Sequence, residues 1–407
     1  MDSAGTERGA PVCWCGERDL QPYSPAYALC ATCGTLVARL GLTASATAVH
    51  DDDQAFYGKD YWLLHQIEDL GNPDITRRAR TDLADRCMHW LRTVLRYAPP
   101  PARVLEVGCA HGGFVALLRW AGYDATGLEL SPWVVDYARR TFDVPVLLGP
   151  VEEQAVPEGS LDVIVLNDVV EHLPDPLATL GACARLLKPD GVMVVQMPSF
   201  PEGTTYEELK ARKSHFLNHM DGKAQREHLN LFSTRAARLL FDRLGFTHTD
   251  FVRAVFDVYD MYLVTSRQPL APHDPNALAQ ALATIPEGRV KLGWLDLLAQ
   301  LEPLQADRAA RLDVIQRLDA ECTARQDVIQ RLDAECAARL DVIHRLDADL
   351  RQARADTATD RAERDRLAAE LAARGAGPRS PARKLAGLPR RALRFLKRLG
   401  RPRPTGE

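Results

Sequence analysis

An acidic residue and a glycine-rich turn stand side by side near the first third of the chain. Residues 104–107 form an apolar run interrupted only by Glu106, which predicts a buried strand of a parallel sheet. The turn that follows contains three glycines, at Gly108, Gly112 and Gly113. Glycine lets the backbone approach a ligand closely, and residues 114–120 predict a helix whose N-terminus faces the turn. These residues predict a ligand site at the carboxyl end of the strand.

A second acidic residue ends the next predicted strand, which covers residues 125–130. This residue, Glu129, follows Glu106 by 23 positions. In open parallel sheets, a carboxylate at this place accepts hydrogen bonds from ribose hydroxyls. The two strands therefore predict an α/β fold of the Rossmann type that binds a nucleoside-containing ligand.

Three segments occur in a characteristic order. The first is Val-Leu-Glu-Val-Gly-Cys-Ala-His-Gly-Gly-Phe at 104–114. The second, at 161–176, is a predicted strand that ends in Glu-His-Leu-Pro-Asp-Pro, and the third, at 186–195, begins with Leu-Leu-Lys-Pro-Asp-Gly and leads into another predicted strand. They resemble the first motif, the fourth strand and the lead into the fifth strand of class I S-adenosylmethionine (SAM)-dependent methyltransferases. One departure is Ala110, where the family usually has a second loop glycine.

The resemblance implies a Rossmann-like seven-stranded sheet and SAM as the cofactor. It places the glycine loop near the methionine part of SAM, Val151 or Glu152 near the adenine, and Asn167 near the sulfonium. The implied cofactor-binding residues are Glu106, Gly108, Cys109, Gly112, Gly113, Glu129, Leu130, Val151, Glu152 and Asn167.

Two histidines are candidate catalytic bases, because a hydroxyl acceptor must lose a proton and a neutral imidazole can take it near pH 7. His172 follows the strand at 161–167, and His228 ends an insertion over 198–232 that we interpret as a lid or binding element. We favour His228 over His172, with His215 and His219 as further candidates. The alternative for each is a hydrogen-bonded structural histidine.

Four cysteines within residues 11–50 form two close pairs, each followed by glycine: Cys13, Cys15, Cys30 and Cys33. Four thiolates suit the tetrahedral preference of structural Zn²⁺, so we predict a zinc-ribbon-like module, with unmetallated buried cysteines as the alternative. The other cysteines lack ligand spacing and are interpreted as core or seam residues: Cys87, Cys109, Cys183, Cys322 and Cys336. A four-cysteine module before a methyltransferase domain resembles bacterial methyltransferases of sugar and polysaccharide pathways.

Further segments surround the methyltransferase domain, which we place at 101–267. Residues 51–100 form an aromatic bridge and a helix over the core. The aromatic residues at 56–62 either cover the cofactor or acceptor pocket, or pack the zinc module onto the core. A coiled coil is predicted over 290–374 and a basic amphipathic tail over 378–407.

The coiled-coil prediction rests on three near-copies at 310–323, 324–337 and 338–351, whose period of fourteen equals two heptads. Apolar residues follow 3/4 spacing at Ile315, Leu318, Cys322, Ile329, Leu332, Cys336, Ile343, Leu346 and Leu350. Arg325 and Arg339 fall on the same face and weaken it. We expect a parallel or antiparallel homo-oligomer through residues 310–353, and a solvated single helix is the alternative.

Charge is distributed unevenly along the chain, whose net charge is −4. Residues 378–407 hold ten Lys or Arg and one acidic residue, so the rest of the chain carries a net charge of −13. An acidic protein body repels the phosphate backbone, which disfavours nucleic acid as a partner. Residues 382–403 suit either an anionic membrane surface or a disordered tail. With no apolar run of membrane-spanning length, we expect a cytoplasmic protein, with the tail as a candidate for contact with the inner membrane face.

These features favour an O-methyltransferase acting on a sugar, a glycan or a glycolipid-linked intermediate in envelope polysaccharide biosynthesis. An alternative acceptor is a small aromatic or quinone-like metabolite. A third hypothesis is an inactive SAM-fold scaffold organised by its coiled coil.

Overall fold

The computed structural model describes residues 11–40, 47–49, 51–53, 55–68, 71–220, 227–284 and 288–375. They fall into two compact units, one ending at Ala306 and one beginning at Asp307. The predicted basic tail at 378–407 lies outside the described residues. None of the helices in the described ranges combines the length and the apolar composition of a membrane-spanning segment.

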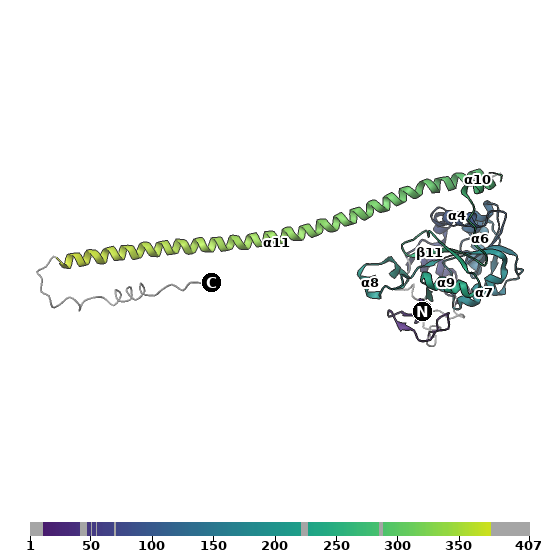
Figure 1. Ribbon diagram of the computed structural model, residues 1–407, viewed down its shortest axis with the longest axis horizontal. Coiled ribbons are helices and arrows are strands. Elements are labelled where there is room, and N and C mark those ends of the chain that lie inside the picture. The colour runs from purple at the N-terminus through teal and green to yellow at the C-terminus, as the bar shows by residue number, and fades with distance from the viewer. Residues whose placement is uncertain are drawn as a thin grey trace. The chain divides into compact units, whose positions relative to one another are not determined.

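The first unit contains the helices α4 and α6 to α10 that are labelled in Figure 1. It is built on a seven-stranded sheet with the strand order β10-β11-β8-β7-β4-β5-β6. Its strands are β4 (Arg103–Val107), β5 (Asp124–Glu129), β6 (Val146–Leu148), β7 (Leu161–Asn167), β8 (Leu187–Pro198), β10 (His248–Val252) and β11 (Asp260–Ser266). β4 to β8 pair in parallel, and the terminal hairpin β10–β11 runs antiparallel along β8. The predicted Rossmann-like sheet is confirmed.

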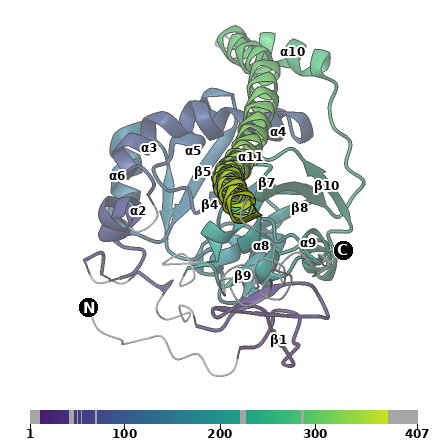
Figure 2. The same ribbon diagram turned by 90° about the vertical axis from the view of Figure 1, so that its left-hand side faces the viewer.

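Helices cover both faces of this sheet (Figure 2). α4 (Met88–Tyr97), α5 (Gly113–Trp120) and α6 (Pro132–Phe142) pack on one face, and α7 (Pro176–Leu186) and α9 (Thr234–Arg243) on the other. Neighbouring strand residues point to opposite faces, so Val104 joins one hydrophobic cluster and Leu105 the other. The side chains of Ser131 and Ser233 cap α6 and α9, because each accepts a hydrogen bond from a backbone N–H of the first turn.

Ahead of the sheet, the chain forms a series of short helices. They are η1 (Tyr61–His65), α2 (Gln66–Glu68), α3 (Ile75–Asp82) and η2 (Leu83–Cys87), followed by α4. The helix predicted within residues 51–100 is therefore present from α3 to α4, but η2 adds a π-helical turn in its middle. Such turns occur often beside functional sites.

The N-terminal module and the insertion share a second, four-stranded sheet of order β1-β2-β3-β9. β1 (Gln21–Pro22), β2 (Tyr27–Leu29) and β3 (Leu36–Ala38) belong to the module, whereas β9 (Asn230–Leu231) ends the insertion. The insertion also contains α8 (Tyr206–Ala211) and η5 (His215–His219). Its Phe200 and Phe216 pack with Tyr27 and Leu36 of the module in one apolar cluster. The module therefore supports the insertion directly.

After α10 (Pro275–Ala283), a single helix, α11 (Gly288–Gly375), runs for 88 residues. Leu292 and Leu295 in its first turns pack against the core of the first unit. From residue 307 to 375 its described side chains are exposed, apart from a half-buried Leu367.

Candidate active site

The turn between β4 and α5 has the backbone conformation that its glycines predict. Gly108 and Gly112 have φ values of 72° and 80°. A Cβ on Gly108 would lie 2.7 Å from the Val169 side chain, so the loop leaves no room for a larger residue there. The same left-handed conformation occurs at Ala110, with a φ of 48°. Glycine is favoured there for a physical reason, since an L-residue in this region is strained.

Replacing Ala110 with Gly is expected to raise the free energy of unfolding by about 0.5–1 kcal/mol. A left-handed conformation costs an L-residue roughly 1–2 kcal/mol, and the greater freedom of glycine in the unfolded chain offsets part of this gain. Urea unfolding measures the difference. Ala178→Gly in α7 is the control and should instead lose about 0.5–1 kcal/mol, because its backbone is right-handed helical. A less stable Ala110→Gly protein would contradict strain at this position.

The loop is also held from the pre-core helices, through a histidine that the sequence did not single out. His111 Nδ1 accepts a hydrogen bond from Gly113 N at 3.0 Å, so Nε2 carries the proton that faces Asp82 Oδ2 at 3.3 Å. Arg78 donates to the same Asp82 oxygen at 3.0 Å. Burial alone would raise the pKa of Asp82, but the hydrogen bond from His111 and the charges of Arg78 and Arg86 hold it at about 2. The contacts connect α3 to the loop.

The two acidic residues of the predicted cofactor site lie on adjacent strands, buried in the first unit. Glu129 accepts hydrogen bonds from the backbone N–H groups of Ala110, Leu130 and Ser131, at 3.1, 2.8 and 3.4 Å. A carboxylate offers about four lone-pair sites, so acceptor capacity remains for a ribose hydroxyl. Burial raises the pKa of both Glu129 and Glu106, and one Glu106 carboxyl oxygen has no partner among the described residues.

Asp52 lies beside Glu129, and no sequence motif predicted its position there. Its two oxygens accept hydrogen bonds from Ser131 Oγ at 2.6 Å and Trp133 N at 2.7 Å. The charge of Asp52 contributes to the raised pKa of Glu129, after burial. Residues 51–53 are thereby fixed over the first turn of α6.

The remaining predicted cofactor residues lie at or beside the carboxyl ends of the parallel strands. Asn167 ends β7, and both polar atoms of its side chain are buried without a partner in the described part of the chain. Val151 and Glu152 lie in the short helix η3 (Val151–Glu153), where Glu152 accepts a hydrogen bond from Thr179 Oγ1. Cys109 is buried against Gly127, whose missing Cβ would lie 2.5 Å from the sulfur. The buried amide of Asn167 needs partners, and a bound polar ligand would supply them.

Three histidines from distant parts of the sequence form a continuous row of rings. The centroids of His172 and His228 are 4.9 Å apart, and those of His228 and His219 are 5.4 Å apart. His219 in turn lies 5.1 Å from Tyr259, and His215 lies 6.4 Å from Tyr259 at the end of the row. Burial lowers the pKa of His172 and His228, and brings that of His219 to about 3. These imidazoles are therefore neutral at pH 7.

Hydrogen bonds define which nitrogen of each candidate base carries its proton. His228 Nδ1 lies 2.8 Å from the carbonyl oxygen of His219, and His172 Nδ1 lies 3.1 Å from that of Glu227. A carbonyl only accepts, so Nδ1 is protonated in both rings and both Nε2 atoms keep a lone pair. Either Nε2 can therefore take the proton of a hydroxyl group that is to be methylated.

Glu171 adds a third hydrogen-bond acceptor beside the Nε2 atoms of His172 and His228. It is buried, one of its oxygens has no partner among the described residues, and burial raises its pKa well above the ordinary value. Ligand atoms of Glu171, His172 and His228 lie within 4.8 Å of one another. Such a cluster can accept hydrogen bonds from hydroxyl groups or hold a divalent cation.

The aromatic bridge contacts this cluster. Tyr57 Oη lies 3.2 Å from His172 Nδ1, and Tyr61 Oη donates to Glu227 at 3.0 Å. His65 also hydrogen-bonds to Glu227. Of the two roles left open by the sequence, these contacts support lining of the acceptor pocket. Sequence patterns did not predict this role of Glu227, because its partners Tyr61 and His65 lie more than 150 positions away.

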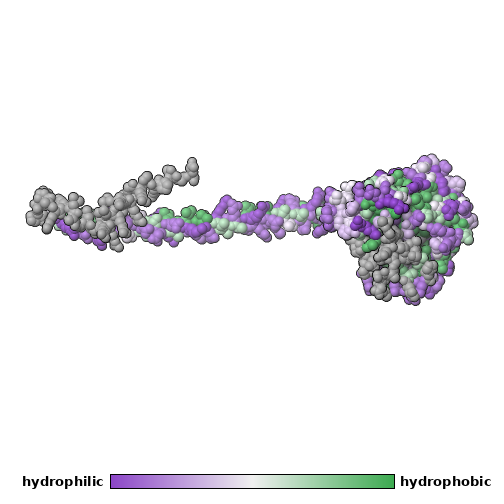
Figure 3. All heavy atoms as spheres, turned by 90° about the horizontal axis from the view of Figure 1, so that it is seen from below, coloured by the Kyte–Doolittle hydropathy of each residue, from purple (hydrophilic) through white to green (hydrophobic). Residues whose placement is uncertain are grey.

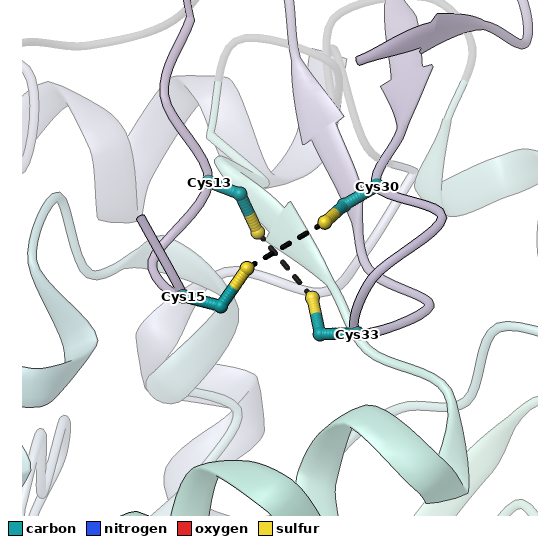
Figure 4. Close-up of side chains that lie close together, drawn as sticks. All are labelled: Cys13, Cys15, Cys30 and Cys33. Carbon is teal, nitrogen blue, oxygen red and sulfur yellow. Dashed lines mark hydrogen bonds between the residues drawn. The ribbon is translucent and has the colours of Figure 1, made fainter. Parts of the chain in front are cut away.

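The four N-terminal cysteines converge as their spacing predicts (Figure 4). Cys13 and Cys33 have their sulfur atoms 3.4 Å apart, and Cys15 and Cys30 have theirs 3.6 Å apart. Disulfide sulfurs would be bonded at about 2 Å, whereas thiolates around tetrahedral Zn²⁺ lie about 3.8 Å apart. The donor set and its spacing therefore fit a structural zinc ion. Cys87, Cys109 and Cys183 are buried, and Cys322 and Cys336 are exposed.

The cysteine module reaches the active site through its sheet. β3 pairs with β9, with Leu36 opposite Leu231, and Ala38 N donates to the Leu229 carbonyl. Tyr27 Oη donates to the backbone carbonyl of His228 at 2.9 Å. The module therefore fixes the backbone that carries His228.

Comparison with known proteins agrees with this geometry. Residues 78–250 match the profile of a family described as a methyltransferase domain. Together with the sheet order, the match identifies this part of the chain as a class I SAM-dependent methyltransferase domain.

Among individual relatives, the ubiquinone biosynthesis O-methyltransferase of Xanthomonas campestris pv. campestris is 38% identical over 104 residues, which cover 24% of this chain and 44% of the relative. The chain thus spans less than half the length of the curated relatives it matches. Similar solved structures include a putative methyltransferase of Haloferax volcanii in complex with the activator Trm112 (18% identity, 49% of this chain, 96% of that chain, TM-score 0.37). A Pyrococcus horikoshii protein has 20% identity, covers 52% of this chain and all of its own, and has a TM-score of 0.37.

Proposed function

We propose that the protein is a SAM-dependent O-methyltransferase whose acceptor is a hydroxyl of a small aromatic, quinol-like metabolite. The observation that carries the proposal is the half-buried pair His172 and His228, whose unprotonated Nε2 atoms lie beside buried Glu171, one of whose carboxyl oxygens has no partner among the described residues. Several buried acceptors without donors favour a ligand that brings hydroxyl groups.

The choice of acceptor differs from the sugar or glycan that we favoured from the sequence. The matched relatives carry the name ubiquinone biosynthesis O-methyltransferase, which supports the small-metabolite alternative. The rings of Tyr57, Tyr61 and Tyr259 lie beside the histidines and suit a planar aromatic ligand.

The chain contributes binding, alignment and proton removal. When bound, SAM supplies an electrophilic methyl group on its sulfonium. Glu129 would hold the ribose, and Asn167 would bind a polar group near the strand ends. The acceptor hydroxyl would donate its proton to Nε2 of His228, with His172 as the alternative, so that its oxygen can bond to the methyl carbon as the carbon–sulfur bond breaks.

Calorimetric titration with SAM and S-adenosylhomocysteine tests the cofactor site. Glu129→Ala should weaken binding by about 2–3 kcal/mol, or roughly 30- to 150-fold, because a charged acceptor for the ribose is lost. Glu158→Ala removes an exposed carboxylate of the same domain and should bind like the wild type. A folded wild-type protein that binds neither ligand would favour the inactive scaffold instead.

The acceptor is then identified with methyl-labelled SAM and two panels, one of catechols and quinols and one of nucleotide sugars and glycans. Transfer to the first panel alone supports the proposal. Transfer to sugars alone would refute it and favour the sugar or glycan acceptor predicted from the sequence.

We also propose that Cys13, Cys15, Cys30 and Cys33 bind one structural Zn²⁺. Their sulfur separations support this proposal, and metal analysis of the purified protein tests it.

A further inference from the structure

The long helix α11 carries a row of exposed apolar side chains that the proposed function does not use. In the described residues of the second unit, Ile315, Ile329 and Ile343 are 56–60% exposed, and Leu318, Leu332 and Leu346 are 53–62% exposed. Figure 3 shows hydrophobic residues among hydrophilic ones along this helix. A regular apolar row of this length is expected to be covered by another helix.

The heptad positions indicate which helix covers it. In the repeat over 315–350, the three isoleucines occupy position a and the three leucines occupy position d. Isoleucine at a combined with leucine at d favours a parallel coiled coil of two helices. We propose that α11 pairs with α11 of a second copy of this chain as a parallel, in-register, two-stranded coiled coil over residues 315–350.

The alternating heptads set the register. Between the Ile/Leu heptads stand Cys322 with Arg325, and Cys336 with Arg339, at the same a and d positions. A shift by one heptad would place each Ile/Leu heptad against a Cys/Arg heptad, whereas the unshifted pairing matches like with like over the whole repeat. Polar core positions of this kind cost stability but specify register.

Each seam arginine already has a carboxylate partner on its own helix. Arg325 lies 2.6 Å from Glu321, and Arg339 lies 2.6 Å from Glu335. These acids occupy position g, directly beside the seam, so the guanidinium groups can point outward while their methylene stems cover the neighbouring layers. The arginine layers are therefore compatible with a paired helix.

The two cysteines report the orientation of the pair. In a parallel, in-register coil, residues at a face their own counterparts, which brings Cys322 close to Cys322 of the second copy and Cys336 close to Cys336. In an antiparallel coil, a faces d, and the d positions hold leucine or arginine, so no cysteine would face a cysteine. Only the parallel arrangement allows a disulfide at these positions.

The first experiment measures the mass of the full-length chain by light scattering and its cross-linking by diamide. The expected mass is twice the chain mass of 45.1 kDa. Diamide takes two electrons and two protons from a pair of thiols and leaves one disulfide. After remaining thiols are blocked with N-ethylmaleimide, Cys322→Ser and Cys336→Ser should each still give a covalent dimer on a denaturing gel. The double variant should give no covalent dimer but keep the doubled mass. A monomeric or trimeric mass, or a dimer that does not cross-link, would overturn the proposal.

A second experiment breaks the seam. Ile329→Asp with Leu332→Asp should give a monomer that still binds SAM like the wild type, because residues 78–250 are unchanged. The control is Gln330→Asp, which adds a carboxylate at position b, outside the seam, and should remain dimeric. A seam variant that stays dimeric would refute the pairing. Because mass and SAM binding are measured separately, failure of the coiled coil and failure of the proposed methyltransferase activity are distinguishable.

Discussion

The His228→Asn variant should lose a factor of about 10²–10⁴ in kcat while binding SAM with unchanged affinity. Asparagine keeps an N–H where Nδ1 donates to the His219 carbonyl, so the local backbone is preserved. It has no counterpart of Nε2, and the acceptor hydroxyl would then lose its base. Single-turnover kinetics with labelled SAM measures the loss.

His172→Asn is the matched comparison, because His172 Nδ1 has the same kind of carbonyl partner. A larger loss in His172→Asn than in His228→Asn would transfer the role of base to His172. The pH profile adds a second readout. Burial lowers the pKa of both rings from the ordinary value of 6.5, so the fall of wild-type activity toward acidic pH should have its midpoint below pH 6.5. The variant should lose this acidic limb, and equal kcat values in variant and wild type would refute the proposed chemistry.

Loss of the proposed zinc ion from the cysteine module should abolish methyl transfer and leave SAM binding nearly intact. Structural zinc contributes about 10–16 kcal/mol to folding in small zinc modules, which exceeds what three short strands can supply alone. Cys30→Ser should therefore unfold residues 11–40, remove β3 from β9, and release the backbone that carries His228. Metal content, calorimetry with SAM and kcat are measured on the same preparation.

Thr32→Ala is the control for this experiment, since it removes an exposed hydroxyl of the same module and keeps all four cysteines. It should bind zinc and retain activity. Full activity in Cys30→Ser, or wild-type protein without metal, would show that the cysteines serve packing alone.

The sequence predicts best those features that depend on neighbouring residues. Apolar runs predicted the strands β4 and β5 at the centre of the sheet. The spacing of Cys30 and Cys33 predicted a convergent cluster, since a glycine turn folds such a pair onto one point. Each of these rests on local backbone preferences.

The composition of the proposed acceptor site could not be predicted in the same way. Tyr57 meets His172 across 115 positions, and Tyr61 meets Glu227 across 166. Such contacts depend on how the bridge packs over the sheet, and no periodicity records this packing. The strain at Ala110 could not be predicted either, because the sequence shows that the usual glycine is absent but not that the backbone has a positive φ angle there.

The pairing of β3 with β9 has a consequence for synthesis of the chain on the ribosome. Leu36 and its partner Leu231 are 195 positions apart, so the N-terminal module leaves the ribosome long before its last strand exists. Closing a loop of this length carries an entropic cost that only the folded central sheet between them can reduce. We therefore expect the module to wait with an open strand edge until the methyltransferase core has formed, and the site around His228 to be completed last.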